Sequence, residues 1–247
     1  MIPLRSEKEI QMLKKSGAIL AKVMRELEKS IKAGVSTRQI DALAESLILA
    51  QGALPAFKGY RGFPASVCAS INEEIVHGIP SDRKLKDGDI IGLDLGVNFK
   101  GYFSDAAVTL AIGKVPAKVK KLIDVTRAAL AEGIKGAKPG NHLSDISARI
   151  QQYVEANHFS VVRQFVGHGI GLSLHEEPEI PNFGQANRGP LLKEGMCLAI
   201  EPMVNMGGWE AEILENGWTA VTKDRLPSAH FEHTVVITAK GNEILTK

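Results

Sequence analysis

Cysteine is scarce in this sequence, because the 247 residues include only two, Cys68 and Cys197. Two thiols cannot build a disulfide framework or a cysteine-rich zinc cluster, and such low usage is typical of a reducing compartment. We therefore expect a cytoplasmic protein. An excess of one charge is also lacking, since 30 basic residues face 28 acidic ones and the net charge is +2. This balance removes the electrostatic case for nucleic-acid specificity.

Long apolar runs are absent as well. No stretch of about 18 apolar residues occurs, which argues against a membrane span. The first ten residues carry charges and no apolar core, so the sequence predicts no signal peptide. Hydrophobic residues make up 44% of the chain and charged residues 23%, which are ordinary values for a globular protein.

A repeat relates the two halves of the chain. The segment 85–97, LKDGDIIGLDLGV, aligns without a gap with 192–204, LKEGMCLAIEPMV. In this alignment Asp94 falls on Glu201. The two acids are therefore expected at equivalent places in two copies of one unit.

A second block supports the duplication. The segment 32–42, KAGVSTRQIDA, aligns with 138–148, KPGNHLSDISA, at nearly the same offset. Two blocks in the same order indicate a duplicated unit rather than a chance match. We predict a single domain, 1–247, built from two pseudo-twofold-related units at approximately 6–112 and 115–240.

Each unit has the pattern of two helices followed by strands. Capping boxes, Ser6 with Glu9 and Ser36 with Gln39, predict the first two helix starts. The four helices are expected to begin at Ser6, Ser36, Pro116 and Leu143, and the last two to end near Ile134 and His158. Strands are expected at about 66–71, 89–97, 102–112, 161–166, 196–205, 212–222 and 230–238. This order predicts an α+β fold in which helices cover a mostly antiparallel β-sheet.

Two aspartates lie in the apolar segment 92–110, GLDLGVNFKGYFSDAAVTL. If the four residues 98–101 form the loop of a hairpin, Asp94 lies directly opposite Asp105. The Cβ atoms of such a pair are about 4.5–5.5 Å apart, and like charges there are destabilising. A shared proton, a neighbouring cation or bound metal ions would each relieve the repulsion.

Further metal-ligand types lie at matching positions. Glu201 is the repeat partner of Asp94, and Glu232 in HFEHTVVIT matches Asp105 in SDAAVTLAI. Glycines flank His168 in the segment VGHGIGLSLHEEP. Four carboxylates and one imidazole suit two divalent ions. This donor set favours Mn, Fe(II), Co or Zn over thiolate-preferring metals and leaves the native metal open.

With these residues assembled, the chain resembles the type I methionine aminopeptidases over its whole length. Five motifs carry the resemblance in order, namely VCASINEEIVHGIP, GLDLGVNFKGYFSDAAVT, VGHGIGLSLHEEP, AIEPM and FEHTVVIT. The resemblance implies the pita-bread fold. It implies removal of the N-terminal methionine from nascent proteins and peptides with a small second residue, through a hydroxide activated by two metal ions. It also implies the metal ligands Asp94, Asp105, His168, Glu201 and Glu232.

The resemblance further implies individual roles. Glu201 would pass the proton of the attacking water to the leaving amine, His175 would contact the carbonyl oxygen, and His77 would hydrogen-bond the peptide. The residues implied to surround the substrate are Tyr60, Phe63, Cys68, His77, Leu174, His175 and Trp218. A sodium or potassium ion is implied near Asn72, Glu74 and Ser228.

Two positions depart from the pattern of well-known bacterial members. Phe57 replaces a cysteine, and Leu174 replaces an aromatic residue. These differences should alter the shape of the pocket and have little effect on the class of reaction.

Two alternatives use the same residues. Xaa-Pro aminopeptidases and prolidase-like peptidases share the ligand set, but they usually carry a large N-terminal domain, whereas the segment before Asp94 is short and mostly helical. The interval from Glu201 to Glu232 is too short for the helical insert of type II methionine aminopeptidases. A non-catalytic peptide-binding relative would have lost ligands, and all five are present. We expect a monomer without membrane contact that meets the ribosome only transiently.

Overall fold

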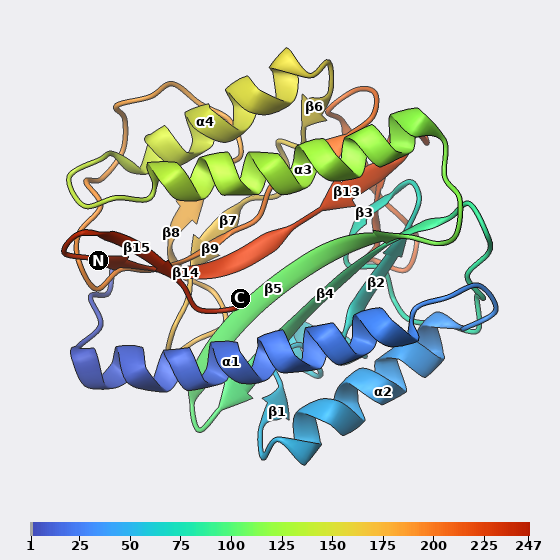
Figure 1. Ribbon diagram of the computed structural model, residues 1–247, viewed down its shortest axis with the longest axis horizontal. Coiled ribbons are helices and arrows are strands. Elements are labelled where there is room, and N and C mark those ends of the chain that lie inside the picture. Colours follow the sequence, from blue (N-terminus) through green and yellow to red (C-terminus); the bar gives the residue numbers. More distant parts are fainter. Residues whose placement is uncertain (1) are drawn as a thin grey trace.

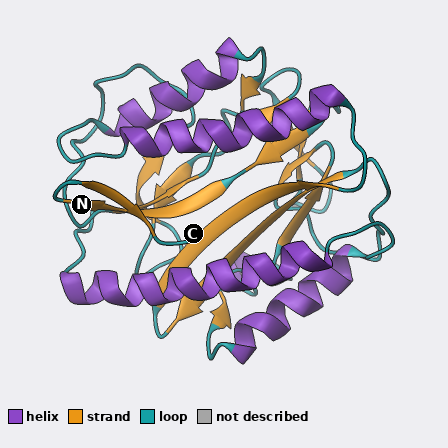
Figure 2. Ribbon diagram, viewed as in Figure 1, coloured by secondary structure: helices purple, strands orange, loops and turns teal. Residues whose placement is uncertain are grey.

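The computed structural model describes residues 2–247, so Met1, the first residue of the predicted domain, lies outside the described part of the chain. Two pairs of helices lie on one face of a curved sheet (Figure 1), and the strands run between and behind them (Figure 2). The helices are α1 Glu7–Ser30, α2 Thr37–Ala50, α3 Ala117–Gly136 and α4 Leu143–Ala156. Within residues 2–247 no helix is long and apolar enough to cross a membrane.

The predicted helix starts are confirmed. Ser6 and Ser36 both form capping boxes, in which the cap hydroxyl accepts the N–H of the third helical residue and the side chain of that residue accepts the N–H of the cap. Pro116 is the N-cap of α3. The fourth helix ends earlier than predicted, because His158 has a φ of 65°, which is outside the right-handed helical region.

The strands form one large sheet and two small ones. The bounds are β1 Leu54–Pro55, β2 Cys68–Ile71, β3 Glu74–Val76, β4 Ile90–Phe99, β5 Tyr102–Ala111, β6 Ser160–Val161, β7 Gly167–Gly169, β8 Glu176–Ile180, β9 Cys197–Ile200, β10 Met203–Asn205, β11 Ala211–Ile213, β12 Ala220–Thr222, β13 Ser228–His230, β14 Glu232–Thr238 and β15 Gly241–Ile244. A short 3₁₀ turn, Tyr60–Gly62, lies between β1 and β2.

The nine-stranded sheet has the order β1-β4-β5-β14-β9-β7-β8, with β2 also paired to β4 and β15 to β14. The order β13-β10-β6 forms one small sheet and β11-β12-β3 the other. The pairings that we describe are antiparallel. The predicted α+β class with a mostly antiparallel sheet is therefore confirmed.

Three predicted strands prove to be pairs of shorter ones. The expected strand at 196–205 divides into β9 and β10, which belong to different sheets, and Pro202 lies at the break. Proline has no N–H to donate, so it interrupts a ladder. The strands expected at 212–222 and 230–238 divide into β11 with β12 and β13 with β14.

The β4–β5 hairpin has a tighter turn than predicted. Phe99 pairs with Tyr102, which leaves Lys100 and Gly101 as a two-residue loop. Both loop residues have positive φ, 54° and 87°. Positive φ at both positions is characteristic of the type I′ turn, whose twist matches that of the flanking strands.

This turn changes the relation of the two aspartates. Asp94 pairs with Ala107 and Asp105 pairs with Gly96, so the prediction that the aspartates lie directly opposite each other is wrong. The difference from the predicted register is two residues along the partner strand. Because side chains alternate with a period of two, both carboxylates stay on the same face as diagonal neighbours.

Apolar residues on the other face of β4 attach the sheet to the helices. Leu93, Leu95 and Val97 belong to one apolar core with residues of α1 and α2, including Leu20 and Ile40. Alternation along the strand then directs Asp94 away from this core. The second helix pair covers a corresponding core that includes residues of β9 and β14.

Candidate metal centre

A cavity of about 160 Å³ opens on the face of the sheet that the helices leave free. Its lining residues are Phe57, Tyr60, Arg61, Phe63, Cys68, His77, Asp94, Asp105, His168, Leu174, His175, Glu201, Trp218 and Glu232. The structure thus brings together every residue predicted to bind a divalent metal, to act in catalysis or to contact the substrate. The residues predicted for a monovalent cation are not among them.

The five candidate metal ligands come from neighbouring strands of the large sheet. Asp94 and Asp105 lie on the β4–β5 hairpin, and Glu232 begins β14, where it pairs with the residue two beyond Asp105. Glu201 directly follows β9, and His168 lies on β7, which pairs with β9. Strand pairing therefore brings together residues that are far apart in sequence.

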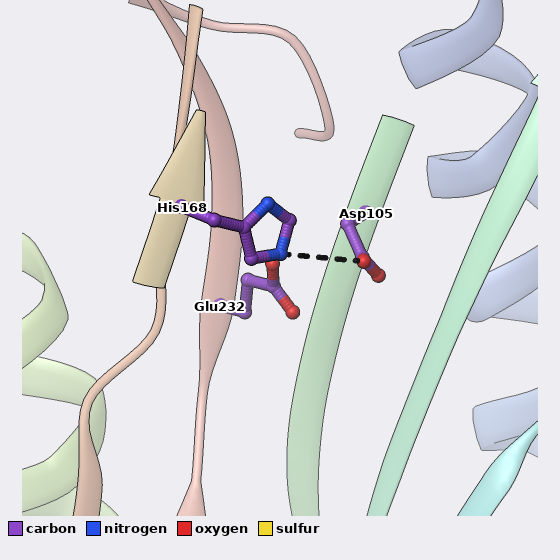
Figure 3. Close-up of side chains that lie close together, drawn as sticks. All are labelled: Asp105, His168 and Glu232. Carbon is purple, nitrogen blue, oxygen red and sulfur yellow. Dashed lines mark ion pairs between the residues drawn. The ribbon is translucent and has the colours of Figure 1, made fainter. Parts of the chain in front are cut away.

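The distances between these side chains are short. The Nε2 atom of His168 lies 3.5 Å from Oε1 of Glu201 and 4.0 Å from Oδ2 of Asp105. Figure 3 shows the His168 ring directed between Asp105 and Glu232, and one ligand atom from each of these three residues lies within 4.8 Å of the others. Nδ1 of His168 lies 2.9 Å from the carbonyl oxygen of Gly169. A proton on Nδ1 would satisfy that contact and leave the Nε2 lone pair facing the acids, which is the usual arrangement of a metal-binding histidine.

Loss of hydration perturbs the ionisation of this cluster. Desolvation raises the pKa of Asp94 to about 7. It also raises the pKa values of Asp105, Glu201 and Glu232 well above their ordinary range, and repulsion from the neighbouring carboxylates adds to the shift. Desolvation lowers the pKa of His168 to about 4. In the absence of cations, the ionised form of these carboxyl groups is therefore unfavourable.

Several oxygens of the cluster are left without partners. Among residues 2–247, no hydrogen-bond partner reaches Oδ1 of Asp94, Oδ1 of Asp105 or Oε1 of Glu232, although all three atoms are buried. Buried polar atoms are rarely unpaired in folded proteins, and such exceptions call for an explanation. Oxygen and imidazole donors in this arrangement fit divalent metal ions.

Two histidines border the candidate metal ligands. Nδ1 of His175 lies 2.9 Å from the hydroxyl oxygen of Tyr60, and its ring centroid is 4.2 Å from that of His168. Desolvation lowers the pKa of His175 to about 3 and lowers that of His77 as well. Both rings are therefore neutral at pH 7. The rings of His77 and Trp218 lie nearly perpendicular to each other, with centroids 6.4 Å apart.

An apolar pocket adjoins the candidate metal ligands. Tyr60, Phe63, Cys68, Leu174 and Trp218 belong to one cluster, and the rings of Phe63 and Trp218 meet edge to face with centroids 5.2 Å apart. Desolvation raises the pKa of the Cys68 thiol well above its ordinary value. This cysteine is therefore a neutral, weakly polar wall of the pocket rather than a nucleophile.

Sequence reasoning missed two residues of the site, Arg61 and His230. Phe57, which was expected to alter the shape of the pocket, lines the cavity, and a Cβ built on Gly96 would lie 2.9 Å from its ring. Arg61 lines the cavity beside Tyr60. His230 is 3% exposed, and its Nε2 lies 3.7 Å from Oε2 of Glu201. The position of His230 two residues before Glu232 was the available signal, because alternate residues share a face.

The residues predicted for a monovalent cation lie together elsewhere. The backbone N–H of Ser228 donates to the carbonyl oxygen of Asn72 at 2.9 Å. The carboxylate of Glu74 accepts a hydrogen bond from the Ile71 N–H and pairs with Arg83. A cation site made of backbone oxygens near these residues stays a prediction.

Comparison with known proteins agrees with this site. The sequence pattern of metallopeptidase family M24 matches residues 11–239. The chain therefore belongs to metallopeptidase family M24.

Individual relatives narrow the comparison. Methionine aminopeptidase 1 of Bacillus subtilis is 51% identical over 247 residues, which covers 100% of both chains. The crystal structure of methionine aminopeptidase from Rickettsia prowazekii superposes with a TM-score of 0.99 at 40% identity and 100% coverage of both chains. The resemblance to methionine aminopeptidases and the pita-bread fold that it implied are confirmed.

The prolidase-like alternative is less well supported. The prolidase from Pyrococcus horikoshii superposes with a TM-score of 0.81 at 25% identity, and this chain covers 63% of it. The catalytic fold is thus shared between the two groups, whereas full-length similarity favours the methionine aminopeptidases.

Proposed function

We propose that this protein is a methionine aminopeptidase, which removes the N-terminal methionine of peptides and nascent proteins whose second residue is small. The observation that supports the proposal most strongly is the joint presence of five metal-ligand side chains and an adjacent apolar pocket in one cavity. Relatives that carry this name match the chain from end to end.

The metal centre would be held by Asp94, Asp105, His168, Glu201 and Glu232. We propose two divalent ions, of Co, Mn, Fe(II) or Zn, because four carboxylates supply more donor atoms than a single ion needs and balance more than one divalent charge. Such ions supply Lewis acidity toward the scissile carbonyl and lower the pKa of water.

The chain's own residues would carry out the proton transfer. The carboxylate of Glu201 lies at the edge of the ligand cluster, with its side chain 13% exposed. From there it can accept a proton from water and return it to the departing amine. His230, whose Nε2 lies 3.7 Å from Oε2 of Glu201, borders the same carboxylate.

His175 would stabilise charge that develops on the carbonyl oxygen. Its ring is neutral at pH 7, since desolvation lowers its pKa to about 3. If the Tyr60 hydroxyl donates to Nδ1 of His175, the proton of the imidazole resides on Nε2 and is available to the substrate. A donor fixed in this way stabilises the transition state more than the substrate. His77 would hydrogen-bond the peptide beside the scissile bond.

The apolar pocket would receive the methionine side chain. A thioether makes favourable contacts with aromatic rings, and Tyr60, Phe63 and Trp218 line the cavity. Leu174 also lines the cavity and is 2% exposed. A small second residue is the expected preference, because the space beyond the scissile bond is restricted in the family that the chain resembles.

We propose that nascent chains are its substrates. We also propose a cytoplasmic monomer that contacts the ribosome transiently and has no nucleic-acid specificity. We also propose that the two sequence repeats form one domain, which is supported by β5 from the first unit and β14 from the second pairing directly in one sheet.

A peptide assay tests the function. The protein supplied with Mn²⁺ or Co²⁺ should release methionine from Met-Ala-Ser much faster than from Met-Leu-Ser, should lose this activity in EDTA and should regain it with added metal. The released amino acid is measured by chromatography. Activity that is indifferent to EDTA, or equal cleavage of the two peptides, would contradict the proposal.

A further inference from the structure

The loop from Gly171 to His175 carries two side chains that line the cavity, Leu174 and His175. It connects β7 to β8 and has no regular structure of its own. Its N-terminal end is tied to the hairpin, because the N–H of Phe103 donates to the carbonyl oxygen of Gly171 at 2.8 Å. His175 lies at the other end of the loop, and the hydrogen bond to Gly171 does not fix the position of the residues between them.

Glu176 ties the middle of this loop together. Its Oε1 accepts the N–H groups of Leu172 and Ser173 at 2.8 and 2.9 Å. Its Oε2 pairs with the guanidinium of Arg5. The two side chains are only 12% and 6% exposed. A shielded carboxylate with three donors has little freedom to move, because hydrogen bonds to an ionised group are the stronger kind.

Arg5 belongs to the N-terminal segment that precedes α1, and it reaches the loop through its pair with Glu176. Its own N–H donates to the carbonyl oxygen of Gly195 at 2.8 Å, which fixes the backbone from which the side chain extends. Its guanidinium also lies against the loop backbone. A Cβ built on Gly171 would come within 2.5–2.7 Å of three guanidinium atoms, so the absence of a side chain at Gly171 makes this contact possible.

We propose that Arg5 and Glu176 are positioning residues that hold His175 in register with the substrate carbonyl. The inference rests on the proposed function, because the pair would act through the contact that His175 makes there. Removing one partner leaves the other charge shielded from water and unpaired, which disturbs the structure around it. A displacement of about 1 Å in a catalytic group can cost about a hundredfold in rate.

The decisive experiment compares one substitution in two backgrounds. We expect R5A to lower kcat/KM for Met-Ala-Ser at least tenfold in the otherwise unchanged protein. In the H175A background the same substitution should lower kcat/KM by less than threefold, because the group that Arg5 positions is already gone. A general structural defect would instead multiply the two losses, and such double-mutant comparisons measure coupling directly.

A matched control uses the other ion pair near the start of α1. Lys14 pairs with Glu243 at 2.8 Å, but these side chains are 34% and 46% exposed and are not among the residues that line the cavity of the candidate metal centre. K14A should change kcat/KM less than twofold in either background. Urea unfolding followed by circular dichroism establishes that each variant is folded at the assay temperature.

If R5A does not fold, G171A permits the same comparison, since its methyl group would occupy the space of the guanidinium. Equal losses in the two backgrounds, or a loss below threefold in the unchanged protein, would overturn the inference. Absence of methionine release by the unchanged protein with Mn²⁺ would instead overturn the proposed function. The two failures are therefore distinguishable.

Discussion

Replacing Asp94 with Asn should make the metal-free protein more stable at neutral pH. The folded protein raises the pKa of Asp94 to about 7, chiefly through desolvation, from 3.8. Between these two values the folded state binds more protons than the unfolded state. The contribution of protonated Asp94 to the free energy of unfolding is therefore lost as the pH rises through this window. Asparagine has nearly the same shape and never ionises, so it removes the contribution.

The magnitude follows from the size of the pKa shift. A change from 3.8 to about 7 corresponds to about 4 kcal/mol in the free energy of unfolding once Asp94 is fully ionised. About 2 kcal/mol of this loss falls between about pH 5 and pH 7. We expect metal-free D94N to be more stable than the unchanged protein by about 2–4 kcal/mol at about pH 7.5. With metal this difference in stability should narrow or reverse. A bound ligand at a hundred times its Kd adds about 2.7 kcal/mol to the free energy of unfolding, and the unchanged protein keeps all its candidate ligands.

Urea unfolding in EDTA at several pH values, followed by circular dichroism, measures the effect. D82N is the matched control, since Asp82 is exposed and its pKa is lowered by hydrogen bonding to Arg38. The control should not gain stability. If metal-free D94N were no more stable than the unchanged protein at neutral pH, or lost stability with pH at the same slope, the electrostatic account of the cluster would be refuted.

Three further predictions concern activity and packing. Glu201→Gln should lower kcat at least about a hundredfold without unfolding the protein, because an amide cannot accept the proton. Steady-state assays with Met-Ala-Ser measure the effect, and activity within about tenfold of the unchanged protein would contradict the assigned role. Leu174→Ala should raise KM for the same peptide by about tenfold through lost contact area, and an unaltered KM would show that this side chain does not touch methionine. Gly17→Ala should lower the free energy of unfolding by about 1–3 kcal/mol, because the new methyl group would clash with the carbonyl group of Leu245. Helix propensity alone predicts that alanine stabilises the helix. A higher Tm would therefore refute the packing argument.

The helices were the most predictable elements, and the reason is local. A capping box such as Ser6 with Glu9 is complete within one turn of chain, so its sequence pattern and its structure coincide. The strand breaks were less predictable. Pro202 gave a signal, but whether the chain on each side joins the same sheet depends on neighbours far away in sequence.

The candidate metal centre was predictable in composition and not in geometry. The repeat related Asp94 to Glu201, and the motifs indicated the remaining ligands. The prediction that Asp94 lies directly opposite Asp105 was wrong, because the turn contains two residues rather than four. Both loop lengths keep the two aspartates on one face, so only the hydrogen-bonded register distinguishes them.

The sequence by itself determined which side chains are candidates for the metal centre, where the helices begin and which family the chain belongs to. These properties reside in short motifs and in their order along the chain. Tertiary structure decided how far each carboxylate is desolvated, that His230 borders Glu201 and that Arg5 pairs with Glu176. Such properties arise only when distant segments pack together and exclude water, and no local pattern encodes that distance.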